Sequence, residues 1–139
     1  MFHHLDFRVH CHATEDEEKV LLAFTFVSGV EKPEVTRAKG FHGNPITVFK
    51  ASIKEAWAIR AFWDRVEEAG DLDAIVQSLE RSIDRRCQLH LRFDKQEAYQ
   101  GRIRVVEHGD VIALRGKVAA YPARRRRAIE AAQLYFQGG

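Results

Sequence analysis

Three segments of the chain alternate between apolar and polar side chains, and this pattern constrains the fold most strongly. In residues 4–12, 88–93 and 112–121 the apolar residues recur at every second position, and histidine, arginine or other polar residues fill most of the positions between them. Successive side chains of a β-strand point to opposite faces of its sheet. The three segments therefore predict strands that bury one face in a core and expose the other to solvent.

The exposed face of these strands is predicted to be cationic. Its basic candidates for ligand contact are Arg8, His10, Arg92, Arg115 and Lys117. The net charge of the chain is only +2, but acidic residues concentrate in segments 15–18 and 67–73, away from the basic strands. Segregated positive charge attracts a polyanion even where the net charge is small. We therefore expect this face to bind RNA.

Helical patterns separate the strands and predict an α+β fold. The predicted helices span residues 15–28, about 52–70, 71–83 and 123–134, and the further strands span residues 35–38, 46–51 and 103–106, the last as a hairpin with 111–121. A capping box begins at Thr14, and Ser52 is predicted to cap the next helix. Trp57, Phe62 and Trp63 lie at helical spacing and are predicted to belong to the core. Together the elements predict a two-layer sandwich, a mostly antiparallel or mixed sheet of five or six strands with helices on one face.

The length and composition predict one domain. A chain of 139 residues with 45% hydrophobic and 30% charged residues can form a single core, which we assign to residues 1–133. Residues 134–139 look like part of a tobacco-etch-virus protease recognition site left by an expression tag. Cys11 and Cys87 fit reduced, buried thiols. With no apolar run long enough to span a bilayer and no signal-peptide core, the predicted location is cytoplasmic.

Two further basic segments are candidates for RNA contact. Lys39 precedes, and His42 lies within, a loop at 40–45 that has a Gly-x-x-Gly spacing. This loop could clamp phosphates, or its glycines could serve turn geometry alone. Arg124 and Arg125 begin an arginine run at the start of the last predicted helix, where the helix dipole disfavours cations. A phosphate partner would compensate for that position, although solvated arginines are the alternative.

The histidines on the first strand raise the question of a metal. His4, His10 and His12 share a face, and alternate strand residues could supply two or three zinc ligands. No cysteine pair and no His-Glu-x-x-His motif accompanies them, so we predict neither a metal nor a cofactor. The chain also lacks the motifs of the common hydrolases and nucleotide-binding enzymes.

Residues 2–20, 40–45 and 118–122 resemble a small archaeal family of predicted RNA-binding proteins or exosome subunits. The resemblance extends from Phe2 to about Glu130. It implies a fold similar to the ribosomal protein that carries 5S rRNA, and it brings no catalytic residues with it.

Three hypotheses for function follow. The leading one is a non-catalytic, cytoplasmic RNA-binding protein, an accessory of the exosome, of RNA processing or of ribosome-associated machinery, whose partner is structured or single-stranded RNA. The second is a protein-interaction or dimerisation module that uses the open sheet face, in which a homodimer would cover that face. The third is a weak ribonuclease in which His10 or His42 acts as acid or base.

Overall fold

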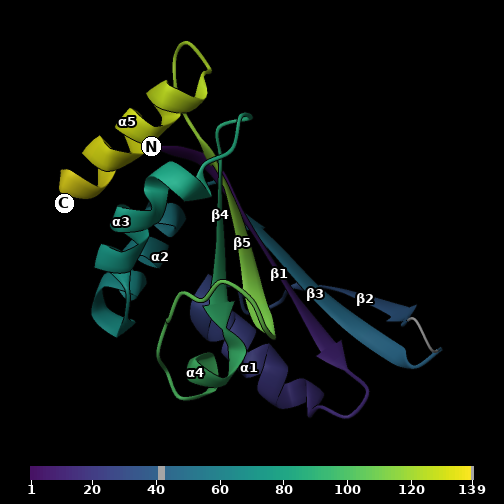
Figure 1. Cartoon of the computed structure of the whole chain (residues 1–139). Helices are drawn as coiled ribbons and strands as arrows, with labels where there is room; N and C mark the ends of the chain where they lie inside the picture. Colours follow the sequence, from purple (N-terminus) through teal and green to yellow (C-terminus); the bar gives the residue numbers. More distant parts are fainter. Residues whose placement is uncertain (41–42, 139) are drawn as a thin grey trace.

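The computed structural model describes residues 1–40 and 43–138, and within them it contains one sheet and five helices (Figure 1). The strands are β1 (Phe2–His12), β2 (Glu34–Lys39), β3 (Pro45–Ile53), β4 (Gln88–Asp94) and β5 (Val111–Val118). The helices are α1 (Glu17–Ser28), α2 (Ala56–Ala69), α3 (Leu72–Ser82), α4 (Lys95–Tyr99) and α5 (Arg125–Gln137).

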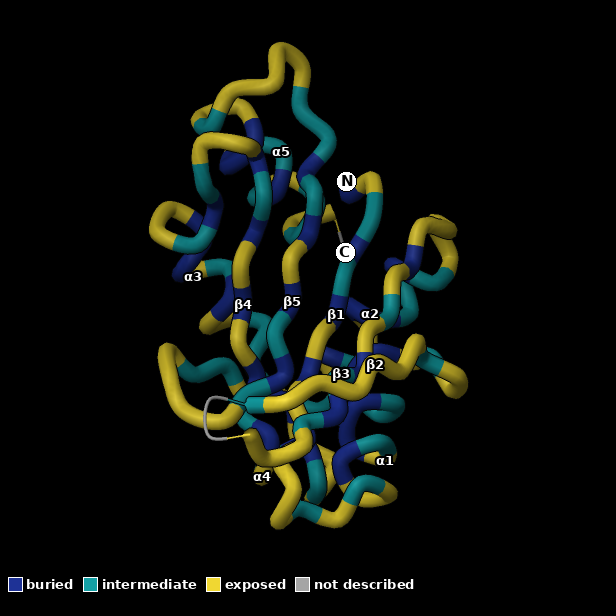
Figure 2. Tube along the Cα trace, turned by 90° about the vertical axis from the view of Figure 1, so that its right-hand side faces the viewer, coloured by how far each residue is buried: buried dark blue, intermediate teal, exposed yellow. Residues whose placement is uncertain are grey.

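The five strands form an antiparallel sheet in the order β2-β3-β1-β5-β4. The helices gather on one side of this sheet, as Figure 1 shows, and β1 lies in its centre. The predicted α+β two-layer sandwich is confirmed. Figure 2 shows exposed residues along the whole of β2, which forms one edge of the sheet.

The core lies between the sheet and the helices, where the predicted apolar faces of the strands meet. Leu5, Phe7 and Val9 of β1 are buried there, and Phe7 packs edge-on against Phe62 of α2 with 5.1 Å between ring centroids. Gly116 of β5 also faces the core, where a Cβ atom would lie 2.8 Å from Leu5 Cδ2. A larger residue at this position would have to displace the Leu5 side chain, which glycine avoids.

Two predicted helix caps are wrong. Asp16 caps α1 in place of Thr14, and its carboxylate accepts from the Glu18 amide at 3.0 Å. Ser52 belongs to β3, because the pairing of β3 with β1 continues as far as Ile53. The side chain of Ser52 is thereby placed on the sheet surface.

The predicted hairpin of residues 103–106 with 111–121 is also wrong. β5 ends at Val118, and both of its edges are occupied, by β1 and by β4. The segment around residue 105 instead follows the outer edge of β4, where the Val106 amide donates to the Arg92 carbonyl at 2.9 Å. The sheet therefore has five strands.

Trp57 does not belong to the core, as 76% of its surface is exposed. The buried residues of α2 are Ile59, Phe62, Trp63 and Val66, and Trp57 lies on the opposite side of the helix because two residues correspond to about 200° of rotation. Only the predictions for Phe62 and Trp63 are confirmed.

The last helix extends beyond its predicted end, to Gln137. The ring of Phe136 lies 4.8 Å from that of Trp63, and the ring of Tyr135 lies 5.5 Å from that of Phe2. Residues 134–137 thus form part of α5, and their origin in an expression tag stays a prediction. None of the described helices has both the length and the hydropathy of a membrane-spanning segment.

Candidate nucleic-acid interface

The outer face of the sheet, opposite the helices, carries its polar residues in rows that run across the strands. In the first row, Arg8 of β1 pairs with Lys50 of β3 on one side and with Ala113 of β5 on the other, and Ala113 pairs with Arg92 of β4. We call these four residues the cation row. Because neighbouring strands lie about 4.8 Å apart, the row is about 14 Å long.

Acidic groups offset the cation row only in part. Glu34 of β2 is the cross-strand partner of Lys50 and lines the same groove. Among the described residues, the ion pairs include none to Arg8, Lys50 or Arg92. Arg92 donates only to the backbone carbonyl of Glu107, at 3.4 Å. All three side chains are exposed to solvent. An anion that approaches this row therefore meets three cations, with Glu34 as an acidic neighbour at the Lys50 end.

The neighbouring row has a different electrostatic character. It consists of Ser52, Asp6, Arg115 and His90, which are cross-strand partners of one another, and we call it the Asp6 row. Asp6 accepts a hydrogen bond from the Ser52 hydroxyl at 2.6 Å, and its other oxygen lies 3.7 Å from Arg115 Nη2. At the end of the row, His90 Nε2 lies 2.7 Å from Asp84 Oδ2. Each cationic group here has an anionic neighbour.

Asp84 stays ionised beside His90. Burial raises the pKa of its carboxyl. Hydrogen bonds from His90 and from the amides of Gln88 and Arg86 lower this pKa by more than burial raises it, so it lies below the ordinary value.

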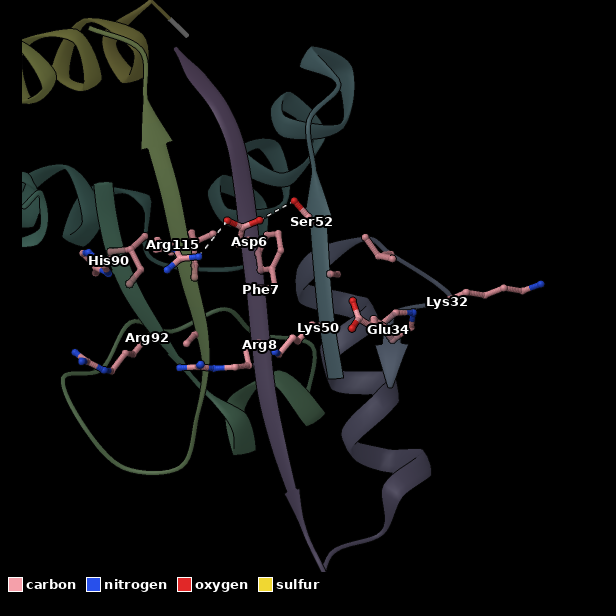
Figure 3. A pocket seen from close by; sticks show the side chains of 16 residues that line it. Asp6, Phe7, Arg8, Lys32, Glu34, Lys50, Ser52, His90, Arg92 and Arg115 are labelled. Atoms are coloured by element: carbon pink, nitrogen blue, oxygen red, sulfur yellow. Dashed lines mark hydrogen bonds and ion pairs between the residues drawn. The ribbon is translucent and has the colours of Figure 1, made fainter. Parts of the chain in front are cut away.

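A groove of about 740 Å³ extends over both rows (Figure 3). Residues of the connection that leads into β2, including Lys32, line one side of it, and β4 lines the other. Figure 3 shows the side chain of Arg8 extending from β1 across β5, towards β4. The groove therefore combines an open shape with a positively charged row, whose three cations outnumber the neighbouring Glu34.

The structure places the predicted site residues in three groups. Arg8, Arg92 and Arg115 line the groove. His10 and Lys117 lie on the same strands as groove residues but outside its lining, and Lys117 Nζ donates to the Arg86 carbonyl. Burial, followed by the charges of Arg8, His12 and Lys95, lowers the pKa of His10, so this residue is a neutral hydrogen-bonding group near neutral pH.

The remaining predicted residues lie away from the groove or outside the described residues. Lys39 is exposed at the end of β2, and His42 lies in the segment 41–42, which the structure does not describe. Arg124 precedes α5 and is exposed. Arg125 donates to the backbone carbonyls of Ile83, at 2.9 Å, and of Glu80, and thereby joins α5 to α3.

Sequence reasoning missed a buried charged cluster at one end of β1. The side chain of Lys95, at the start of α4, is fully buried. Its ammonium donates to the His10 carbonyl at 2.7 Å, to Asp110 Oδ2 at 2.8 Å and to both carboxylate oxygens of Glu15, the nearer at 3.1 Å. We call Lys95, Glu15 and Asp110 the Lys95 cluster. It connects β1, the segment before α1, the start of α4 and the residue before β5.

The Lys95 cluster perturbs its titratable neighbours. Burial alone raises the pKa of Glu15, but hydrogen bonds from the His12 amide and from Lys95, together with the Lys95 charge, hold it below its ordinary value. Burial and the Glu15 carboxylate raise the pKa of Tyr99 to about 12. Tyr99 donates to that carboxylate at 3.3 Å and is partly buried, so its ring is not free for base stacking.

Glu15 and Asp110 of this cluster, together with the neighbouring His12, have the composition of a metal site. Ligand atoms of His12, Glu15 and Asp110 lie within 4.8 Å of one another. The Lys95 ammonium already bonds to both carboxylates, so the protein supplies its own cation at this position. The predicted histidine set was different, and the structure pairs His4 with Asp6, at 3.1 Å, rather than with His12.

Two residues that shape the groove could have been found from the sequence. Lys50 occupies an alternate position in the predicted strand 46–51, and Asp6 lies on the polar face of the first strand. What no local pattern shows is that Lys50 lies beside Arg8, because that neighbour relation depends on the register between β3 and β1.

Comparison with known proteins gives a consistent family assignment. A family model described as RNA binding matches residues 4–118. The chain belongs to this family. An RNA-binding protein from Pyrococcus abyssi is 34% identical over 98% of this chain and 94% of its own length. An uncharacterized protein from Methanocaldococcus jannaschii is 33% identical over 73% of this chain and 74% of its own length.

A solved structure supports the same assignment. The DUF54 protein Mth689 from Methanothermobacter thermautotrophicus is 39% identical, with a TM-score of 0.85 over 96% of this chain and 97% of the other. The predicted resemblance to an archaeal family of RNA-binding proteins is thus confirmed. The links to the exosome and to the 5S-rRNA-carrying ribosomal protein stay predictions.

Proposed function

We propose that the protein binds RNA in the groove over the cation row. The observation that carries this proposal is the alignment of Arg8, Lys50 and Arg92 on three strands, where they outnumber Glu34, the acidic neighbour of Lys50. Membership in the RNA-binding family, and a relative named as an RNA-binding protein, support it. Phosphate groups supply most of the electrostatic attraction between a nucleic acid and its protein, and arginine and lysine are their usual partners.

The character of the groove favours RNA over a second protein molecule as its occupant. The centre of a protein–protein interface is depleted in charged residues and enriched in aromatic ones. Here the exposed residues of the cation row are charged, whereas large exposed apolar residues such as Trp57 and Leu22 lie on the helices. A dimer that covered the groove would have to desolvate these cations.

We further propose that the protein holds RNA without cleaving it, as a cytoplasmic accessory of the exosome, of other RNA processing or of ribosome-associated machinery. The protein would contact RNA phosphates through charged side chains on a rigid sheet, and such contacts need neither a cofactor nor a metal. Incubation of the purified protein with labelled RNA, followed by gel electrophoresis, tests the absence of cleavage. Cleavage that disappears in His10→Ala or His42→Ala would establish the ribonuclease in its place.

Charge reversal in the groove tests RNA binding itself. Fluorescence anisotropy is measured with labelled single-stranded and hairpin RNAs over a series of salt concentrations. We expect log affinity to fall with log salt with a slope of about 2 for a single strand, from about 0.7 per phosphate contact at three cations. The variant Arg8→Glu/Arg92→Glu should bind at least about tenfold more weakly and show a smaller slope.

The matched control is Lys19→Glu/Arg81→Glu, which changes the net charge equally on the exposed surface of α1 and α3. This variant should retain most of the affinity. If both variants lose affinity to the same extent, binding depends on net charge and not on the groove. If neither loses affinity, RNA does not bind at the cation row.

A further inference from the structure

The cation row contains one residue without a long side chain. Ala113 lies between Arg8 and Arg92, as the cross-strand partner of both. It is the smallest of the residues that β5 presents on the outer face, where Val111, Arg115 and Lys117 occupy the other positions. The row therefore has its smallest side chain on β5, with an arginine on the strand at either side.

Arg8 extends over β5, whereas the Arg92 side chain is turned to the outer side of β4, where it donates to the Glu107 carbonyl at 3.4 Å, and it would change rotamer to approach Ala113. Arg8 and Arg92 start two strands apart, which is about 10 Å. Figure 3 shows that the Arg8 side chain already extends across β5 in the direction of β4. A guanidinium group presents several N–H donors in one plane and binds phosphate oxygens in pairs. A phosphate above Ala113 would accept hydrogen bonds from one or both arginines.

The rows on either side are less suited to a phosphate. The Asp6 row places a carboxylate at its centre, which would repel a phosphate at that position. On the other side His10 pairs with Val48 and Asp94 pairs with Val111, and burial lowers the pKa of His10, the cationic candidate there. Positive charge in excess is therefore found on the cation row alone among these three rows.

The groove also lacks a platform for base stacking. Apart from His90, the one aromatic residue among the described residues that line it is Phe7, which is 2% exposed and belongs to the core. Proteins that bind single-stranded RNA through its bases usually stack them on exposed aromatic rings. The contacts available here are those to phosphate and ribose.

We propose that the RNA backbone crosses the strands along the cation row, with one phosphate seated over Ala113 between Arg8 and Arg92. Binding in this mode reads the sugar–phosphate backbone and not the base sequence. The ribose of the same nucleotide would face the Asp6 row, whose carboxylate keeps a second phosphate away. This inference rests on the proposed function, because it specifies how the same groove holds RNA.

The test fills the space over Ala113 without a change in charge. Ala113→Leu puts a branched side chain where the phosphate would sit, and we expect about tenfold weaker binding with a salt slope lower by about 0.7 for a single strand. Ala113→Ser keeps the space and should bind as the parent protein does. Val111→Leu, on the same strand and face but in the next row, should also bind normally. Thermal unfolding of each variant verifies that the sheet is intact.

Base independence is measured with labelled oligomers of adenosine, uridine and cytidine of equal length, which should bind within about threefold of one another. A preference of more than about tenfold for one base overturns backbone reading. If Ala113→Leu binds normally while Arg8→Glu/Arg92→Glu binds weakly, the phosphate seat is wrong and the groove remains the RNA site. If Arg8→Glu/Arg92→Glu also binds normally, the proposed function fails together with the seat.

Discussion

Replacement of Lys95 by methionine would remove the only cation that the Lys95 cluster contains. The variant keeps a flexible apolar chain of similar length, so packing changes little. The ammonium donates to the His10 carbonyl, to Glu15 and to Asp110, and all three would lose that donor. The carboxylates of Glu15 and Asp110 would then repel each other without the positive charge that now binds both.

The magnitude follows from the burial of the three partners. Loss of one member of a buried ion pair costs about 3–5 kcal/mol. The Lys95 side chain is 0% exposed, but those of Glu15 and Asp110 are 19% and 47% exposed, so water screens part of their repulsion. We therefore expect a loss of about 3 kcal/mol in the free energy of unfolding. For a domain of this size the melting temperature would fall by about 10 °C.

Thermal unfolding followed by circular dichroism near neutral pH measures this effect. Lys50→Met is the matched control, since Lys50 is exposed on the outer face and its loss should change stability by less than about 0.5 kcal/mol. Adding Glu15→Gln and Asp110→Asn to Lys95→Met should restore about half of the lost stability or more, because the remaining groups are neutral. A Lys95→Met protein as stable as the control would refute the reasoning. If the triple variant is no more stable than Lys95→Met, the loss of stability in Lys95→Met comes from packing and not from repulsion between the carboxylates.

Two further outcomes are expected. In the folded protein the pKa of Glu15 lies below its ordinary value of 4.5. The ionised Glu15 therefore stabilises the fold above that pH, and this contribution is lost as the pH falls through the lowered pKa. Melting temperatures measured down to acidic pH should fall less steeply for Glu15→Gln than for the parent. Deletion of residues 134–139 removes Tyr135 and Phe136 from their contacts with the core, and it should cost about 2 kcal/mol and shift the fluorescence of Trp63 to longer wavelength. An unchanged melting curve after this deletion would mean that the tail does not stabilise the fold.

Several elements of the fold could be predicted from local patterns because local physics decides them. The alternation in β1 fixes which side chains face the core whatever the strand pairs with, and Leu5, Phe7 and Val9 are buried as predicted. The end of α1 at Gly29 is also local, since its φ of 76° is one that glycine adopts readily. The predicted cap at Ser52 failed because a distant segment, β1, pairs with that residue, whereas at Thr14 the neighbouring Asp16 supplies the cap.

The sequence by itself determined that one face of the sheet is apolar and the other cationic, because strand geometry sends successive side chains to opposite sides. Only the tertiary structure decided which of the outward residues act together. The register between β3, β1, β5 and β4 brings Lys50, Arg8 and Arg92 into one row and places Asp6 in the next. Long-range packing likewise joined Arg125 to α3 and buried Lys95 between two acids. Register and long-range packing depend on residues far apart in the chain, and for that reason no local pattern could reveal them.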